Sequence, residues 1–125
     1  MSDENPFIDI GDVPPQQIWE GVVARPLHGE RVTLALIELA ANSLVPEHSH
    51  ANEQVGILVR GSCRFRVGEE TEAIDSGGTW RIRGGVPHEV EVGPDGAVVL
   101  EIWSPPRDDW RDVEREEPRP SPWPE

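Results

Sequence analysis

The sequence predicts an all-β domain, either a small antiparallel barrel or a sandwich, and three observations support this fold class. Its 125 residues are the length of one domain with a single hydrophobic core. Its 12 glycines and 13 prolines recur along the chain and interrupt every window long enough for an amphipathic helix. The segments between them are short and rich in Val, Ile, Leu and Thr, a composition typical of β-strands joined by turns.

Eight or nine strands are expected in order along the chain, each bounded by turn-forming residues. They cover residues 18–25, 31–39, 45–50, 55–60, 62–67, 71–74, 79–83, 88–92 and 97–103. The segments 26–30 and 68–70 are expected to close two hairpins. Gly61 is expected to end one strand, and Gly93-Pro94-Asp95-Gly96 is expected to form the turn between the last two.

The two ends of the chain differ in composition from the middle. We expect a polar N-terminal arm at residues 1–15, the barrel at 16–110 and an acidic, proline-rich tail at 111–125. Residues 112–125 contain five acidic residues and four prolines, which favours disorder or an extended strap. Trp110 and Trp123 could instead dock this segment on the barrel or on a neighbouring subunit, so a docked and a free tail are both open.

Charge and cysteine content exclude several classes of function. The 24 acidic residues against 11 basic ones give a net charge of −13, which repels nucleic-acid phosphates and anionic lipid surfaces. Cys63 is the single cysteine, which excludes an intrachain disulfide framework and a Cys-rich metal site. With no basic and apolar leader pattern at the start of the sequence, we expect a cytoplasmic protein that binds neither nucleic acid nor membrane.

His48 and His50 are the first candidate functional residues. They are separated by one residue in a strand context, so both imidazoles project from the same face, which is the lumen in a barrel. Two neutral imidazoles one strand repeat apart can chelate a divalent cation. The pair alone is a weak signal, because a polar strand face gives the same pattern.

The wider spacing resembles the two sequence motifs of the cupin superfamily. The first is His48-x-His50-x3-Gln54-x6-Gly61, and the second is Gly77-x5-Arg83-x-Gly85-x2-His88. This resemblance, over roughly residues 35 to 107, implies a single-domain cupin, a double-stranded β-helix of the jelly-roll type. It also implies one divalent metal ion held by His48, His50, Gln54 and His88. Zn, Ni, Mn, Fe and Co all accept such ligands, so the metal is not identified.

Gln54 stands where the usual cupin pattern has Glu, and the acidic Glu53 lies one position earlier. Adjacent strand residues face opposite sides, so the two side chains cannot easily both reach the metal. The interval to Gly61 favours Gln54, with Glu53 as the alternative if a bulge shifts the register. A site of three His and one Gln adds no negative charge, so the cation remains a strong electrophile toward carboxylate or carbonyl oxygen.

A narrower resemblance is carried by the segment Glu101-Ile102-Trp103-Ser104-Pro105-Pro106-Arg107. Together with His48–Gly56 it is similar to the KdgF-like pectin-degradation cupins, which open unsaturated cyclic uronates to linear 5-keto-4-deoxyuronates. The resemblance implies that Glu101 takes the place of a catalytic Asp, Trp103 that of a Phe, and Arg107 that of a substrate-facing Arg. Glu for Asp moves the carboxylate by about 1 Å, enough to mis-aim a proton transfer or to signal a different substrate.

Three functional hypotheses follow for a small anionic substrate such as a sugar acid. The first is a metal-dependent cupin enzyme that isomerises or ring-opens an unsaturated uronate, with Arg107 pairing with its carboxylate and Glu101 relaying protons. The second is a non-catalytic, metal-dependent binding cupin, which the altered Glu101 and Trp103 motivate. The third is another metallocupin enzyme, a lyase or a dioxygenase.

The strand pattern also predicts a homodimer. If Gln54 and Glu101 face the lumen, apolar residues occupy the outward faces of the same two strands. These residues are Val55, Ile57, Val59, Val98, Leu100 and Ile102. A second subunit could cover them, or the chain's own first strands could.

Three other residues are assigned no role in the chemistry or a lesser one. Cys63 alternates with charged neighbours and is expected to be a buried apolar residue. His28 lies in a predicted turn and is expected to be solvated. Arg83 precedes the Gly84-Gly85 turn toward His88 and is a candidate anion-binding residue.

Overall fold

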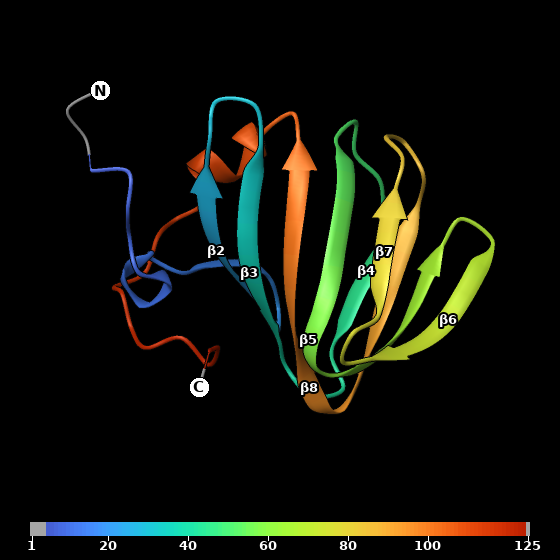
Figure 1. Cartoon of the computed structure of the whole chain (residues 1–125). Coiled ribbons are helices and arrows are strands. Elements are labelled where there is room, and N and C mark those ends of the chain that lie inside the picture. Colours follow the sequence, from blue (N-terminus) through green and yellow to red (C-terminus); the bar gives the residue numbers. More distant parts are fainter. Residues whose placement is uncertain (1–4, 125) are drawn as a thin grey trace.

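The computed structural model describes residues 5–124 and shows a barrel built from antiparallel strands (Figure 1). The eight strands are β1 (Gln16–Trp19), β2 (Val22–His28), β3 (Thr33–Leu39), β4 (Leu44–His48), β5 (Glu53–Val67), β6 (Glu70–Asp75), β7 (Thr79–Ile82) and β8 (His88–Ser104). Two short 3-10 helices flank them, η1 (Ile10–Asp12) and η2 (Asp108–Asp112). The all-β prediction is confirmed, and within the described residues no helix is long and apolar enough to cross a membrane.

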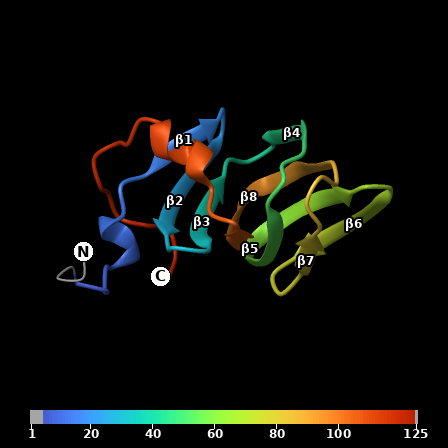
Figure 2. The same ribbon diagram turned by 90° about the horizontal axis from the view of Figure 1, so that it is seen from above.

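Strand order places β5 and β8 at the centre of the sheet. The order is β1-β2-β3-β8-β5-β6, with β4 also paired to β8 and β7 to β5. The pairing of β5 with β8 runs from Glu53 opposite Ser104 at one end to Val67 opposite His88 at the other. Viewed from above, in Figure 2, β1, β2 and β3 lie toward one side and β6 and β7 toward the other, and both terminal segments lie on the side of β2. The chemistry-bearing residues of β5 and β8 are therefore adjacent in the middle of the sheet.

β5 and β8 are each one long bent strand, whereas two shorter strands were expected in each place. Gly61 has φ +93°, and a Cβ there would lie 2.0 Å from the carbonyl oxygen of Gly96. The backbones of β5 and β8 therefore approach each other more closely than any residue but glycine permits. Between the Gly61–Ala97 and Cys63–Val92 pairs, residues 93–96 of β8 face the single Ser62 of β5. The predicted turn at 93–96 is therefore a bulge that bends the strand without ending it.

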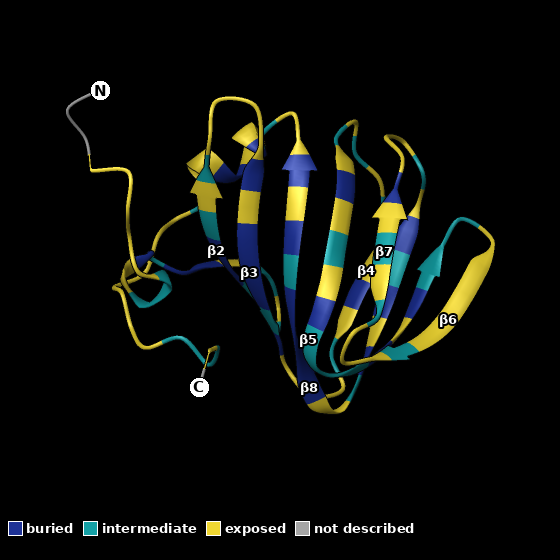
Figure 3. Cartoon of the chain, viewed as in Figure 1, coloured by how far each residue is buried: buried dark blue, intermediate teal, exposed yellow. Residues whose placement is uncertain are grey.

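The core lies on the inner face of the strands, where buried apolar side chains alternate along each strand with outward residues that are more exposed (Figure 3). Ala24, Ala35 and Leu58 are fully buried. Cys63 is buried among them as predicted, and burial raises the pKa of its thiol to about 11. Burying a Leu or Val side chain contributes about 1.5–3 kcal/mol, so this face stabilises the barrel around the site.

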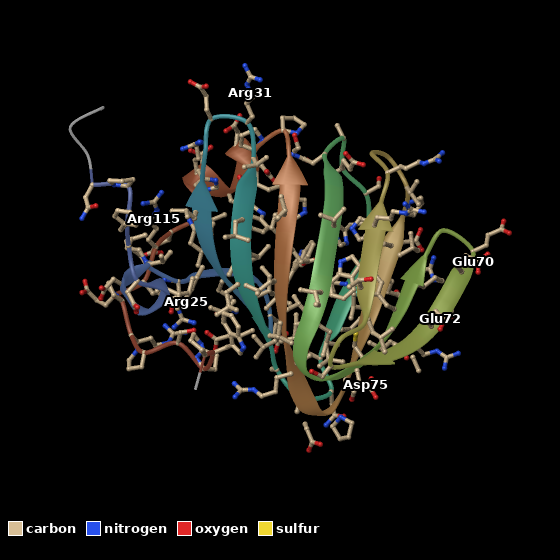
Figure 4. The ribbon with its side chains drawn as sticks, viewed as in Figure 1. Arg25, Arg31, Glu70, Glu72, Asp75 and Arg115 are labelled. Atoms are coloured by element: carbon tan, nitrogen blue, oxygen red, sulfur yellow. The ribbon has the colours of Figure 1, made fainter. Side chains whose placement is uncertain are left out.

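The C-terminal segment is docked on its own barrel, which decides between the two alternatives for the tail. Arg25 of β2, 1% exposed, donates to the carbonyl oxygens of Arg119 and Pro120 and pairs with Glu38. Arg25 lies between β2 and the terminal segments in Figure 4. Arg60 holds the next part of the tail through the carbonyl oxygen of Pro122.

The outer face of the sheet is apolar but only partly open. Leu27, Leu34, Ile102 and Val55 are cross-strand neighbours on β2, β3, β8 and β5, and all four are exposed, as is Ile57. Val98, which the strand pattern places on this face, is 6% exposed and lines a hollow together with Pro122 of the tail, so the chain itself covers this part of the face. Val59 and Leu100 are half-buried.

Candidate metal and catalytic site

Three histidines converge inside the barrel near the ends of β4, β5 and β8. His48 ends β4, His50 follows it, and His88 begins β8, where it is paired in register with His48. One ring nitrogen from each lies within 4.8 Å of the others, close enough for a single metal ion. The grouping predicted from sequence spacing is thus present in the structure.

The backbone fixes the orientation of all three rings. Nδ1 of His48, His50 and His88 lies 2.8, 3.0 and 2.9 Å from the carbonyl oxygens of Pro46, Asn52 and Val86, respectively. A carbonyl oxygen only accepts, so each Nδ1 donates and each neutral ring presents a lone pair at Nε2. This second contact is typical of metal-binding histidines. Nε2 of His88 is buried and has no hydrogen-bond partner within residues 5–124, as expected for a nitrogen that is available to bind a cation.

Burial keeps these histidines in the neutral form that binds a metal. Desolvation lowers the pKa of His88 to about 4, and the nearby charge of Arg107 acts in the same direction. The pKa values of His48 and His50 are also lowered, again chiefly by burial. The rings are therefore not held as cations near neutral pH.

Gln54 lies beside His50 and points inward, whereas Glu53 is exposed on the opposite face. Oε1 of Gln54 is 3.0 Å from Nε2 of His50, and the amide nitrogen of Gln54 donates to Glu101. Because the amide nitrogen donates to Glu101, the amide oxygen of Gln54 must face His50. Nε2 of a neutral His50 ring carries a lone pair, so two hydrogen-bond acceptors face each other. A cation bound by both Oε1 and Nε2 would make this contact favourable. The residues present therefore fit a divalent ion with His and Gln ligands.

Glu101 is the buried acid next to this cluster. Its Oε2 accepts hydrogen bonds from the amide of Gln54 and from Nε1 of Trp80, the latter at 2.7 Å. Burial raises the pKa of Glu101 to about 7, against the opposing effect of these two bonds and of Arg107. A carboxyl group that titrates near neutral pH can both accept and return a proton.

Trp80 was not singled out by the sequence analysis, although the alternation of its strand could have placed it inside. Trp80 and Ile82 alternate with polar residues on β7, and Gly56 lies opposite Trp80 on β5. A Cβ at Gly56 would lie 2.7 Å from the indole ring. Gly56 thus makes the space that lets Trp80 reach Glu101.

Arg107 lies at the start of η2 and lines the same cavity. Its backbone N–H donates to Oγ1 of Thr33 at 2.9 Å. The guanidinium carbon is 4.4 Å from the ring centre of Trp110 and 5.3 Å from that of Trp103. Trp103 is 3% exposed, and its buried indole N–H has no partner among the described residues. Glu101, Trp103 and Arg107 are therefore brought together with the histidines.

The cavity beneath the cluster is small and mostly apolar. Its volume is about 60 Å³, and its walls are formed largely by aliphatic and aromatic side chains. Trp19 forms part of this wall and packs edge-on against His48, with ring centres 4.7 Å apart. Polar groups are concentrated at the cluster, where they can orient a bound molecule.

One expectation about a residue outside the site is wrong. His28 is half-buried rather than solvated, because β2 extends through it and its Nδ1 meets the Thr33 hydroxyl at 2.9 Å. Arg83 is exposed and lines a separate hollow with Glu53 and Arg81, and its role in anion binding stays a prediction.

The comparisons with known proteins agree with this geometry. Residues 35–103, more than half of the chain, match the cupin domain family. A cupin of the RmlC-like type from Shewanella frigidimarina is similar in structure, with 20% identity over 88% of this chain and 99% of that one, and a TM-score of 0.79. KdgF from Halomonas sp. has 18% identity over 85% of this chain and 98% of that one, and a TM-score of 0.77.

Oxalate decarboxylase from Bacillus subtilis is also similar, with 18% identity, a TM-score of 0.70 and coverage of 83% of this chain but 31% of that longer one. No curated protein matches the sequence. The fold and the three-histidine cluster define a small β-barrel of the metal-binding type. The chain belongs to the cupin family, as the family match shows.

Proposed function

We propose that this cupin is a metal-dependent enzyme acting on a small sugar acid, and that its reaction is the isomerisation or ring opening of a 4,5-unsaturated uronate. The observation that carries the proposal is the Gln54 amide, which joins the histidine cluster to a buried acid with a pKa of about 7. The similarity in fold to a KdgF supports the choice of substrate.

The proposed metal ligands are His48, His50, Gln54 and His88. A divalent ion held there would supply Lewis-acid polarisation of a carbonyl or carboxylate oxygen. Glu101 is the proposed proton relay. Its Oε2 is held by Gln54 and Trp80, so the orientation of the carboxyl group is fixed before a substrate arrives.

Arg107 and Trp103 are the proposed substrate-positioning residues. The guanidinium of Arg107 would pair with the carboxylate of the uronate, and the unpartnered indole N–H of Trp103 would donate to a second oxygen. The indoles that surround Arg107 exclude water from this pair, which strengthens it.

A second candidate is a non-catalytic, metal-dependent binding protein for a small molecule. It is supported by Glu101 and Trp103, which stand where the KdgF-like cupins have Asp and Phe, since a shifted carboxylate can bind a molecule without transferring its proton. A lyase or dioxygenase on the same metallocupin scaffold is the third, supported only by the fold similarity to oxalate decarboxylase. A cytoplasmic location stays a prediction.

The test is an assay for loss of the ultraviolet absorbance of an unsaturated uronate, using metal-loaded protein. Metal-dependent loss of absorbance, absent after chelation and restored by the metal, would support the enzyme. A protein that binds the uronate but leaves the double bond intact over hours would support the binding module. Absence of binding would make the uronate proposal wrong.

A further inference from the structure

The guanidinium of Arg107 is engaged by a carboxylate of its own chain. Its Nε and Nη2 atoms donate to the two carboxylate oxygens of Asp109 at 3.1 and 2.9 Å. Two parallel bonds of this kind are the geometry by which an arginine binds the carboxylate of a ligand. Asp109 therefore occupies an edge of Arg107 that a bound acid could use.

The two partners differ in how firmly they are held. The Arg107 side chain is 9% exposed, is stacked near two indoles and has its backbone tied to Thr33. The Asp109 side chain is 63% exposed on the short helix η2, and in residues 5–124 Arg107 is its sole ion-pair partner. If the pair opens, Asp109 is the member that can move outward.

The free energy needed to break the ion pair also differs between the two partners. An exposed carboxylate regains its hydration when it leaves, so separation costs Asp109 little free energy. A buried guanidinium without a counter-charge is costly, so Arg107 requires a replacement anion. A ligand that brings its own carboxylate meets this requirement, and a neutral ligand does not.

We propose that Asp109 is an internal competitor which a carboxylate ligand displaces from Arg107, and that this exchange makes the site selective for acids. The inference rests on the role proposed above for Arg107 as the carboxylate-binding residue. Asp109 is a specificity-determining residue in this scheme and takes no part in proton transfer. Neutral molecules of the same size leave the Asp109–Arg107 pair closed.

Asp108 provides a matched control one residue away. Its side chain is 76% exposed and pairs with Arg111, so Asp108→Asn removes the same charge from the same helix without touching Arg107. The measurement is isothermal titration of zinc-loaded protein with acetate and with D-galacturonate, a saturated uronate that lacks the reactive double bond. Acetamide serves as the neutral ligand.

Asp109→Asn should bind both acids roughly fivefold more tightly than the wild type, the range expected for removing a solvent-exposed competing ion pair. Asp108→Asn should stay within about twofold, a change too small for loss of a direct competitor. The gain should disappear in an Arg107→Ala background, and acetamide binding should not change. Asp109→Ser provides a second variant with the same expected gain.

Equal or weaker acid binding by Asp109→Asn relative to Asp108→Asn would overturn the proposal, and this includes the result that neither acid binds either variant. A gain for Asp109→Asn in a protein that does not open unsaturated uronates would leave this inference standing and refute the proposed reaction. Ring opening by a protein whose Asp109→Asn variant shows no gain would refute the inference alone.

Discussion

The side-chain amide of Gln54 donates a hydrogen bond to the carboxylate of Glu101 while its oxygen faces His50. Gln54 and Glu101 lie on neighbouring strands, with Gly56 opposite Glu101 and Gln54 opposite Trp103. One amide thus contacts both a proposed metal ligand and the buried acid. Glutamate at this position could not donate to Glu101 unless one of the two carboxyl groups carried a proton.

Glu101→Gln should retain metal but lose turnover of the uronate by roughly 100-fold or more, because an amide cannot accept and return the proton. The matched control is Glu53→Gln, which removes the same charge from the exposed face of the adjacent strand. Initial rates by ultraviolet absorbance, with metal content measured in parallel, make the comparison. Equal rates for Glu101→Gln and wild type would show that Glu101 is not the relay.

The stability of the metal-free protein should depend on pH through Glu101. The pKa of Glu101 is about 7 in the folded protein and 4.5 for a glutamate that is not buried, as in the unfolded chain. As pH rises, the unfolded chain therefore releases this proton before the folded protein does. The free energy of unfolding of the wild type therefore falls progressively from about pH 4.5 to pH 7, because above pH 4.5 the folded state holds a proton that the unfolded state has released. Glu101→Gln should remove this loss and gain on the order of 2 kcal/mol relative to wild type between pH 4.5 and pH 8.

Urea unfolding at several pH values, in the presence of a chelator, measures this difference. Glu53→Gln again serves as the control, since it removes an exposed carboxyl group from the adjacent strand β5. A difference in unfolding free energy between Glu101→Gln and wild type that stays constant with pH would mean that folding does not raise the pKa of Glu101.

Metal binding should depend on the three clustered histidines, His48, His50 and His88, and not on His28. His48→Ala and His88→Ala should each abolish binding of one equivalent of divalent metal, because each removes an Nε2 lone pair from the site. His28→Ala is the control, since His28 meets Thr33 and lies outside the cluster. Elemental analysis of folded protein, checked by circular dichroism, gives the stoichiometry.

Full metal content in both cluster variants would make the ligand assignment wrong. A metal-bound crystal structure tests the fourth ligand separately. An oxygen of Glu53 within about 2.5 Å of the ion would replace Gln54 in that role.

The exposed row of Leu27, Leu34, Ile102 and Val55 continues to favour the homodimer predicted from the strand pattern. Ile57→Asp should weaken such a dimer strongly, because an unpaired charge in an apolar interface is costly. Leu44→Asp is the control, as Leu44 is exposed on β4 away from this face. Light scattering at high micromolar concentration measures the mass of the wild type and of both variants. A monomeric wild type would refute the dimer.

The strands and the direction of Gln54 could be predicted from sequence because both follow from local alternation. The long strands β5 and β8 could not, since the close approach of Gly61 and Gly96 depends on a pairing between distant segments. The burial of His28 and the pairing of Asp109 with Arg107 likewise result from packing between elements, which spacing does not encode.

The division of the site between early and late strands bears on how the protein is made. His48, His50 and Gln54 lie in one short stretch of chain, whereas His88 and Glu101 arrive on β8, the last strand in sequence. β8 pairs with β3, β4 and β5, and long-range pairing of this kind forms slowly. During synthesis on the ribosome the complete set of proposed ligands does not exist until His88, the first residue of β8, has emerged. We therefore expect that the full metal site does not guide the first steps of folding.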